Sequence, residues 1–161
     1  MGTSFSQFVQ KISSPIQFGF FLATKLPAAF FVGLRLKEIN ETQCSIGVRH
    51  SFFSKNPFRS MYFAAEAMAA EMSSGLLAFG HIYNQPTKVS MLVIKMVAEY
   101  HKKGTGKLKF ICEDGTAIKN AIAETIQTGE GITLICKSIG INEAGEAVAT
   151  FHFTWSFKAK R

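Results

Sequence analysis

Two glutamates interrupt an otherwise apolar stretch of this sequence. Between Arg59 and His81 the only charged side chains are Glu66 and Glu71. Burying a carboxylate without a partner is costly, so both need an explanation. Burial raises the pKa of a carboxyl group toward neutral pH, which suits it to general-base catalysis. Glu71 is the first candidate for such a base, unless it pairs with a Lys or Arg or reaches solvent at an oligomer surface.

The other candidates in this region have more ordinary interpretations. Glu66 lies away from the apolar stripe of the predicted helix and is typical of a solvent-exposed or ion-paired residue, with catalysis as a secondary role. His50 ends a predicted strand on its apolar face, where a histidine in the core or at its rim is the simpler interpretation. It is kept as a possible secondary site residue.

The stretch that carries the two glutamates is predicted to form one helix over residues 60–79. Apolar side chains recur there at helical spacing, at Met61, Ala65, Met68, Met72, Leu76 and Phe79. The opposite side is rich in alanine and hardly polar, and a helix that is apolar all round is a buried helix. With strands predicted before and after it, the helix is expected to lie inside a sheet that wraps around it.

The elements expected around this helix alternate in pairs. A helical region over residues 4–24 is broken at Pro15. Alternating apolar patterns predict strands over residues 31–40, 43–53, 89–100, 107–113, 131–141 and 146–158, with a short helix at 116–127. Turn sequences at 104–106 and 142–145 indicate hairpins and hence an antiparallel sheet. We expect residues 1–30 to form an N-terminal helical segment that packs on a domain at 31–161, a single domain overall.

Composition limits the classes of function. The chain has 161 residues and a formal net charge of +7, which favours anionic partners. Cys44, Cys112 and Cys136 are far apart and fall on apolar sides of strands, so we predict reduced core cysteines, a cytoplasmic protein and no metal site. We find no convincing membrane span and no nucleic-acid-binding motif, so stable membrane insertion and nucleic-acid binding are not expected.

The order of elements resembles the α+β hotdog fold, a curved antiparallel sheet of about six strands wrapped around one long central helix. The resemblance covers residues 31–157 and extends to the start of the helix. Thioesterases related to phenylacetyl-CoA thioesterase, and an uncharacterised sister family, have an Asn, a Gly-Gly pair and then an acidic residue about two turns into the helix. In this sequence Asn56 matches the Asn and Glu71 matches the acid, while Phe63-Ala64 stands where the family has Gly-Gly.

The resemblance implies an acyl-CoA thioesterase whose site forms across a homodimer interface. Glu71 would be the base, and Asn56 would orient the water or the base. Since a helix N-terminus has free N–H groups and a positive partial charge, the amides of Met61, Tyr62 and Phe63 would form the oxyanion hole and bind substrate. The lysines Lys102, Lys103, Lys107 and Lys109 would bind the phosphates of CoA, which is part of the substrate, and no other cofactor is expected.

Other functions remain open, so the sequence does not settle whether the chain is an enzyme. Phe63-Ala64 in place of Gly-Gly favours a non-catalytic acyl- or lipid-binding hotdog protein with a closed site. A hotdog dehydratase needs a His with a Pro/Gly-rich approach, which the segment after His50 does not supply. Assembly is expected to be a homodimer or a dimer of dimers, because the last strand is long and apolar and exposed sheet edges are a liability.

Overall fold

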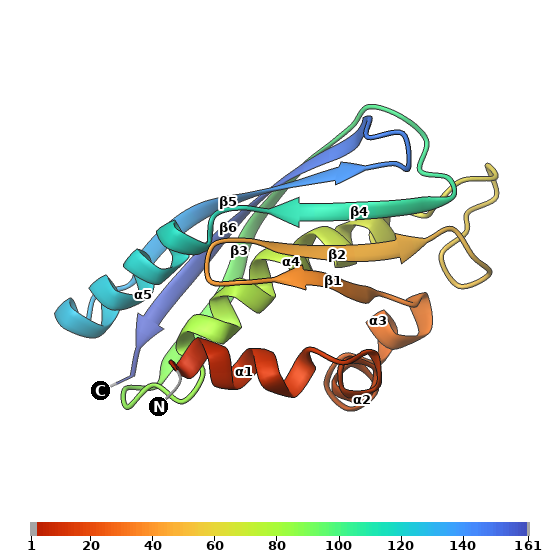
Figure 1. The fold of residues 1–161 in the computed structure, drawn as a ribbon. Helices are drawn as coiled ribbons and strands as arrows, with labels where there is room; N and C mark the ends of the chain where they lie inside the picture. The colour runs from red at the N-terminus through yellow and green to blue at the C-terminus, as the bar shows by residue number, and fades with distance from the viewer. Residues whose placement is uncertain (1–2, 161) are drawn as a thin grey trace.

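The computed structural model describes residues 3–160 and has one curved six-stranded sheet wrapped around a long helix, α4 (Figure 1). All strand pairs are antiparallel, in the order β1-β2-β4-β5-β6-β3. The strands are β1 (Arg35–Ile39), β2 (Cys44–Arg49), β3 (Val89–Tyr100), β4 (Lys107–Cys112), β5 (Ile132–Ile141) and β6 (Ala147–Ala159). This arrangement confirms the predicted α+β hotdog fold.

Helix α4 (Phe63–Ile82) is buried because nearly every side of it is apolar. Its alanines allow close approach of neighbouring elements, and its few polar side chains on the sheet side are paired. Ser73 Oγ lies 2.8 Å from Ser138 Oγ on β5, and Trp155 Nε1 on β6 donates to Ser74 Oγ at 3.0 Å. Both serines are fully buried, so these bonds satisfy polar groups that would otherwise be costly inside the core.

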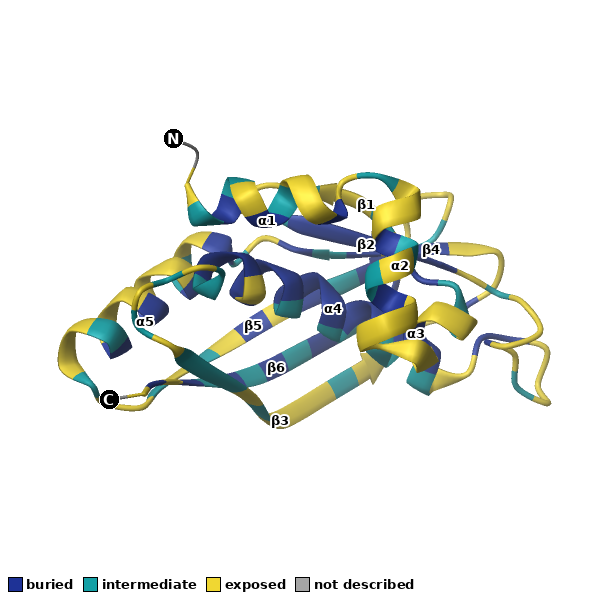
Figure 2. Ribbon diagram, turned by 90° about the horizontal axis from the view of Figure 1, so that it is seen from below, coloured by how far each residue is buried: buried dark blue, intermediate teal, exposed yellow. Residues whose placement is uncertain are grey.

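Three helices lie beside α4 (Figure 2): the first and third pack against it, and the second packs against the other two and β1. They are α1 (Ser4–Ile12), α2 (Pro15–Lys25) and α3 (Pro27–Val32). The predicted break at Pro15 is confirmed, with a capping box between Ser14 and Gln17 at the start of α2. The predicted first strand began too early, because Pro27 starts a third helix that ends at Gly33 in the left-handed region, at φ 86°.

The predicted second strand was too long. After Arg49 the chain turns, and the Ser54 hydroxyl holds the turn by accepting from the Ser51 amide at 2.8 Å and donating to the Arg49 carbonyl at 2.7 Å. His50 therefore lies just beyond β2, and its own amide donates to the Gly106 carbonyl at 2.8 Å. The predicted start of the helix at Ser60 was also wrong, since Tyr62 is the N-cap and Ser60 is bonded to Asn56 instead.

The sheet edge lies where the sequence did not place it. Residues 104–106 are not a hairpin turn, because β3 pairs with β6 at the edge whereas β4 lies between β2 and β5. The last strand, β6, is an interior strand, and the two edge strands are β1 and β3. Along β3 large apolar side chains are exposed, with Leu92 at 64% and Ile94 at 53%. This long apolar edge is unpaired on one side within the described chain.

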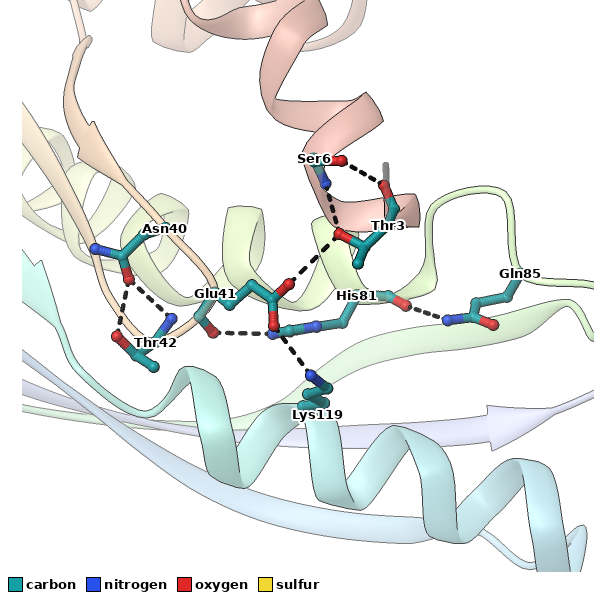
Figure 3. A network of polar contacts seen from close by, with 8 residues as sticks. All are labelled: Thr3, Ser6, Asn40, Glu41, Thr42, His81, Gln85 and Lys119. Carbon is teal, nitrogen blue, oxygen red and sulfur yellow. Dashed lines mark hydrogen bonds and ion pairs between the residues drawn. The ribbon is translucent and has the colours of Figure 1, made fainter. Parts of the chain in front are cut away.

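The far end of α4 is tied to two other segments by polar contacts (Figure 3). His81 Nε2 lies 3.1 Å from the carbonyl oxygen of Glu41, in the β1–β2 turn. The Glu41 carboxylate accepts from Lys119 Nζ at 3.0 Å, and this ion pair lowers the pKa of Glu41. Lys119 belongs to α5 (Gly115–Thr128), which packs beside α4, so the contacts join α4, α5 and the β1–β2 turn.

The three cysteines are buried and free, as expected of core residues. Burial raises the pKa of the Cys44 thiol well above its ordinary value. No group of three His, Cys, Asp or Glu side chains within residues 3–160 is placed to hold a metal ion. Among the helices of the same residues, none combines the length and apolarity that crossing a membrane requires.

Candidate functional site

The loop that leads into α4 is organised by the side chain of Asn56. Its Nδ2 donates to Ser60 Oγ at 3.0 Å and to the Met61 carbonyl at 3.1 Å. Its Oδ1 accepts from the amides of Phe58 at 2.9 Å and Ser60 at 3.2 Å. Both ends of the amide are used within the loop. The structure therefore gives Asn56 a positioning role, which holds the start of α4, in addition to the role predicted toward water or base.

Of the three amides predicted to form an oxyanion hole, two already have acceptors. The Met61 amide donates to the Gly104 carbonyl and the Tyr62 amide to the Ser54 carbonyl, both at 2.7 Å. This corrects the prediction for Met61 and Tyr62, because the helix begins later than expected and both residues belong to the loop. The amides of Phe63 and Ala64, the first two residues of α4, donate to no group within residues 3–160. These two are the donors available to a ligand.

A cavity of about 610 Å³ opens at this helix start. Asn56 and Phe63 line it from one side, Glu66 from the first turns of α4, and Tyr100 and Lys103 from the end of β3 and the segment after it. We call it the entrance cavity. The Phe63 ring is 53% exposed and packs edge-on against Tyr62 at 4.8 Å between ring centroids. Phe63 therefore forms part of the rim.

Glu66 lies in this cavity and is far more buried than its sequence position suggested. Its exposed fraction is only 3%, and its Oε2 has no hydrogen-bond partner within the described chain. Burial raises the pKa of Glu66 to about 7. The side chain fits there because Gly104 has no Cβ, since a Cβ on that residue would overlap the Glu66 carboxylate. The expected surface or ion-paired position of Glu66 was wrong because the 101–106 segment folds over the helix start.

Glu71 lines a different cavity, of about 280 Å³, between α2, α4 and the start of β3. Apart from Lys25, the residues that line it with Glu71 are apolar and include Phe21, Met72, Phe79 and Met91. Burial raises the pKa of Glu71 to about 7. Its carboxylate has no hydrogen bond or ion pair within residues 3–160. We call this the Glu71 cavity.

A single chain does not bring the predicted site residues together. Asn56, Phe63 and Glu66 line the entrance cavity, whereas Glu71 lines the other one, and neither cavity contains both sets. His50 lines neither of them. The chain thus has one half-site with free amides and another with a carboxylate in apolar surroundings.

The lysines predicted to bind CoA phosphates are dispersed, because β3 and β4 are not neighbours. These lysines are Lys102, Lys103, Lys107 and Lys109. Lys102 Nζ is 2.6 Å from a Glu146 carboxylate oxygen, and Lys107 Nζ is 3.8 Å from Glu143. Lys103 lines the entrance cavity, whereas Lys109 lines a shallow hollow beside β4. Two of the four charges are therefore partly neutralised.

Sequence reasoning missed Ala64, Tyr100 and Gly104 as site residues. The two glycines of 104–106 were interpreted as turn formers, although a glycine also marks a close approach of two segments. Gly104 has that second role, since its carbonyl accepts from Met61 and its Cα lies against Glu66. Tyr100 comes from the edge strand, and no local pattern in the sequence links it to the helix start.

Comparison with known proteins supports this architecture. A family model described as "Domain of unknown function (DUF4442)" matches residues 16–157. No curated protein sequence gives a significant match. A solved structure from Pseudomonas aeruginosa, described as a protein of unknown function and probable thioesterase, is 19% identical. It has a TM-score of 0.75 and covers 91% of this chain and 97% of its own.

Two further solved structures are similar. A thioesterase from Haemophilus influenzae is 10% identical, with a TM-score of 0.67 and coverage of 91% of both chains. A Staphylococcus aureus thioesterase, in a variant with alanine in place of a glutamine, is 14% identical, with a TM-score of 0.62 over 80% of this chain and 95% of its own. Another variant of that protein replaces a glutamate with alanine. At these identities the likeness shows a shared fold.

Proposed function

The chain belongs to the family described as a domain of unknown function (DUF4442), and from this starting point we propose that it is a thioesterase that hydrolyses acyl-CoA. In this proposal Glu71 is the general base, and the amides of Phe63 and Ala64 bind the oxyanion. The observation that carries the proposal is the position of the two half-sites at opposite ends of one edge strand, β3, whose outer side pairs with no other strand within the described chain.

The ends of β3 each line one of the two cavities. Met91, near the start of β3, lines the Glu71 cavity, and Tyr100, its last residue, lines the entrance cavity. If two copies pair through their β3 edges in antiparallel fashion, the start of one strand lies beside the end of the other. The Glu71 cavity of one subunit then faces the entrance cavity of its partner. We therefore propose a homodimer with two composite sites.

The edge itself supports this mode of assembly. β3 has twelve residues and pairs only with β6 within the described chain. Its exposed apolar side chains would be covered by a partner, and pairing would satisfy its free backbone groups. Twofold dimers are the commonest homo-oligomers, and pairing through the two β3 strands would give one.

The chemistry follows from the charges of the two half-sites. Glu71 accepts a proton from a water molecule, whose oxygen attacks the thioester carbonyl carbon. The carbonyl oxygen becomes negative and is bound by the amides of Phe63 and Ala64, at the positive end of the α4 dipole. The C–S bond then breaks, the thiolate of CoA takes up the proton from Glu71, and a carboxylic acid is released. CoA enters as part of the substrate, and the proposal requires no other cofactor.

The spacing of two residues gives further support. In the S. aureus protein, the glutamine and the glutamate replaced in the two variants are fifteen positions apart. Asn56 and Glu71 are also fifteen positions apart. Asn and Gln have the same amide group, so the pair matches in chemistry as well as in spacing. The buried free thiols fit a reducing compartment, and we propose that the protein acts in the cytoplasm.

A second candidate function is a non-catalytic acyl- or lipid-binding protein with the same fold. Two observations favour it. The Phe63-Ala64 pair replaces the Gly-Gly of the thioesterases that the sequence resembles, and the Asn56 amide is fully used within its own loop. Such a protein would bind an acyl chain in the apolar Glu71 cavity without turnover.

The deciding experiment measures free thiol release from a panel of short, aromatic and long acyl-CoAs. Loss of a general base lowers the rate by about 10²–10⁴, so Glu71→Gln should lose that much of kcat. Glu71→Gln keeps the shape of the side chain, and Glu124→Gln, at an exposed position on α5, is the matched control. Full activity in Glu71→Gln would refute the assignment of the base. A wild-type protein that binds acyl-CoA but releases no thiol from any substrate would favour the binding protein.

A further inference from the structure

A basic depression of about 240 Å³ lies on the outer face of the sheet, over β1, β2 and β4. Figure 1 shows these three strands side by side. Side chains alternate along a strand, and Val48 and Leu108 are buried toward α4. Their neighbours Arg49 and Lys107 therefore point away from the helix, to the outer face. Arg35 and Lys37 of β1 line the same depression.

A glycine forms the floor of this depression. Gly47 lies opposite Arg35 on β1 and opposite Lys109 on β4. The stem of Lys37 crosses over it, and a Cβ on Gly47 would be 2.6 Å from Lys37 Cε. Because Gly47 has no side chain, the stem of Lys37 can lie across it, which places the Lys37 side chain within the depression beside Arg35, Arg49 and Lys107.

The charges around this hollow are poorly compensated. Arg49 and Lys107 are direct partners across β2 and β4, and like charges in that position repel each other. Arg35, Lys37 and Arg49 have no ion pair within residues 3–160, and Lys107 has only the long one to Glu143. No acidic side chain lines the hollow. A bound anion would relieve this repulsion.

We propose that this depression binds the phosphate groups of the CoA moiety. The inference rests on the proposed function. It keeps Lys107 from the predicted phosphate contacts and replaces Lys102, Lys103 and Lys109 by Arg35, Lys37 and Arg49. Guanidinium groups bind phosphate oxygens in a bidentate fork, and lysines add point charges. Two arginines and two lysines around one hollow suit a ligand with more than one phosphate group.

The depression lies close enough to the entrance cavity for one CoA molecule to reach both. Lys107 lines the depression, and Gly104, three residues earlier, lines the entrance cavity. Three residues of extended chain span at most about 11 Å. The pantetheine arm of CoA is longer than this. Phosphates held in the depression therefore leave the arm able to carry the thioester around the end of the sheet to the amides of α4.

The test measures binding of CoA, 3′-dephospho-CoA and pantetheine by calorimetry at low salt. Wild type should bind CoA most tightly and pantetheine weakest. Arg49→Ala and Lys37→Ala should each lose at least tenfold in CoA affinity, and the exposed Lys158→Ala should change little. Gly47→Ala retains every charge but displaces the stem of Lys37, so it should also weaken CoA binding. Equal CoA affinities for Arg49→Ala, Gly47→Ala and Lys158→Ala would overturn the proposal.

Hydrolysis of two substrates, one with and one without phosphates, tests the phosphate site separately from the proposed thioesterase activity. Arg49→Ala should raise KM for an acyl-CoA and leave KM for the matching N-acetylcysteamine thioester, which lacks phosphates, unchanged. If neither substrate is hydrolysed, the calorimetry still decides whether the depression binds phosphates. Vesicles with and without phosphatidylserine test the competing source of phosphate. If Arg49→Ala abolishes vesicle binding but leaves CoA binding intact, the depression recognises lipid headgroups and the proposal fails.

Discussion

The carboxylate of Glu71 lies over Gly75, one turn further along α4. A Cβ on Gly75 would be 3.0 Å from Glu71 Oε1 and 3.6 Å from the Trp155 ring. The first distance is shorter than an ordinary van der Waals contact, so the direction of the Glu71 carboxylate depends on the absence of a side chain at Gly75. A glycine in a helix interior is normally unfavourable, and here it makes room for the candidate base.

Replacement of this glycine should separate stability from activity. Gly75→Ala should stabilise the helix by up to about 1 kcal/mol, because alanine is the better helix former. The new methyl group should displace the Glu71 carboxylate and lower kcat. Thermal unfolding and thiol release measured on the same samples check both effects. A variant with unchanged kcat would show that the present direction of Glu71 is not required for turnover.

The pH dependence of hydrolysis should report Glu71. A general base acts in its ionised form, and burial raises the pKa of Glu71 to about 7. The rate should therefore rise with pH to a plateau, with a midpoint near 7. The residual activity of Glu71→Gln should not rise with pH around 7. A midpoint near the ordinary pKa of a glutamate, 4.5, would mean that the base is solvated during catalysis.

Glu66 should make the protein less stable at alkaline pH. Its pKa is about 7 in the folded chain and 4.5 as an ordinary glutamate, so between these values the folded state holds a proton that the unfolded state has lost. Stability from this group therefore falls as pH rises from 4.5 to 7. Glu66→Gln should equal wild type near pH 4 and be more stable by about 1–3 kcal/mol at pH 8. Urea unfolding at the two pH values measures the difference, and an equal difference at both would contradict the burial argument.

The Phe63 amide can be removed without breaking the helix. Phe63 is the first residue of α4, where proline is well tolerated, and Tyr62 has φ −67° and ψ 132°, which suit a residue before proline. Phe63→Pro should fold normally and lose about 10²–10³ in kcat through loss of one oxyanion donor. Phe63→Ala retains the amide and is the control. Equal rates for the two variants would place the oxyanion elsewhere.

Composite sites can be tested by mixing two inactive variants. Phe63→Pro damages the entrance half-site, and Glu71→Gln damages the other. Subunit exchange should produce mixed dimers in which one of the two sites is intact, so activity should recover to roughly a quarter of the wild-type level. Each variant alone is the control. No recovery after verified subunit exchange would show that each site forms within one chain.

The sequence predicts the fold well because its signals are periodic. The all-apolar helix around Ala65 and Ala69, and the alternation along the last strand, predict the helix wrapped in a sheet. The order of strands in a sheet leaves no periodic pattern in the sequence. The glycines at 104 and 106 therefore suggested a hairpin between β3 and β4, and that pairing was wrong. The burial of Glu66 was missed for the same reason. It depends on Gly104, which is remote in sequence and comes close only when β3 leaves for the sheet edge.

Some site residues could likewise be predicted from the sequence, and others could not. Glu71 stands out in the sequence because a charge in an apolar helix is unusual, and the structure places it in apolar surroundings. The amides were harder to predict, because the start of a helix depends on where the preceding loop ends. The hydrogen bonds of Asn56 extend that loop to Tyr62, which shifts the free donors from Met61 and Tyr62 to Phe63 and Ala64.

The two buried serine contacts of α4 set the rotation of the helix about its own axis. An alanine-rich helix packed against an apolar sheet has few side-chain contacts that prevent it from rotating or sliding. Ser73 bonded to Ser138, and Ser74 bonded to Trp155, are directional and fix a single angle. The directions of all other side chains of α4 follow from this rotation of the helix about its axis. The direction of the Glu71 side chain is thus set by two buried hydroxyl groups, of Ser73 and Ser74, that hold the helix against β5 and β6.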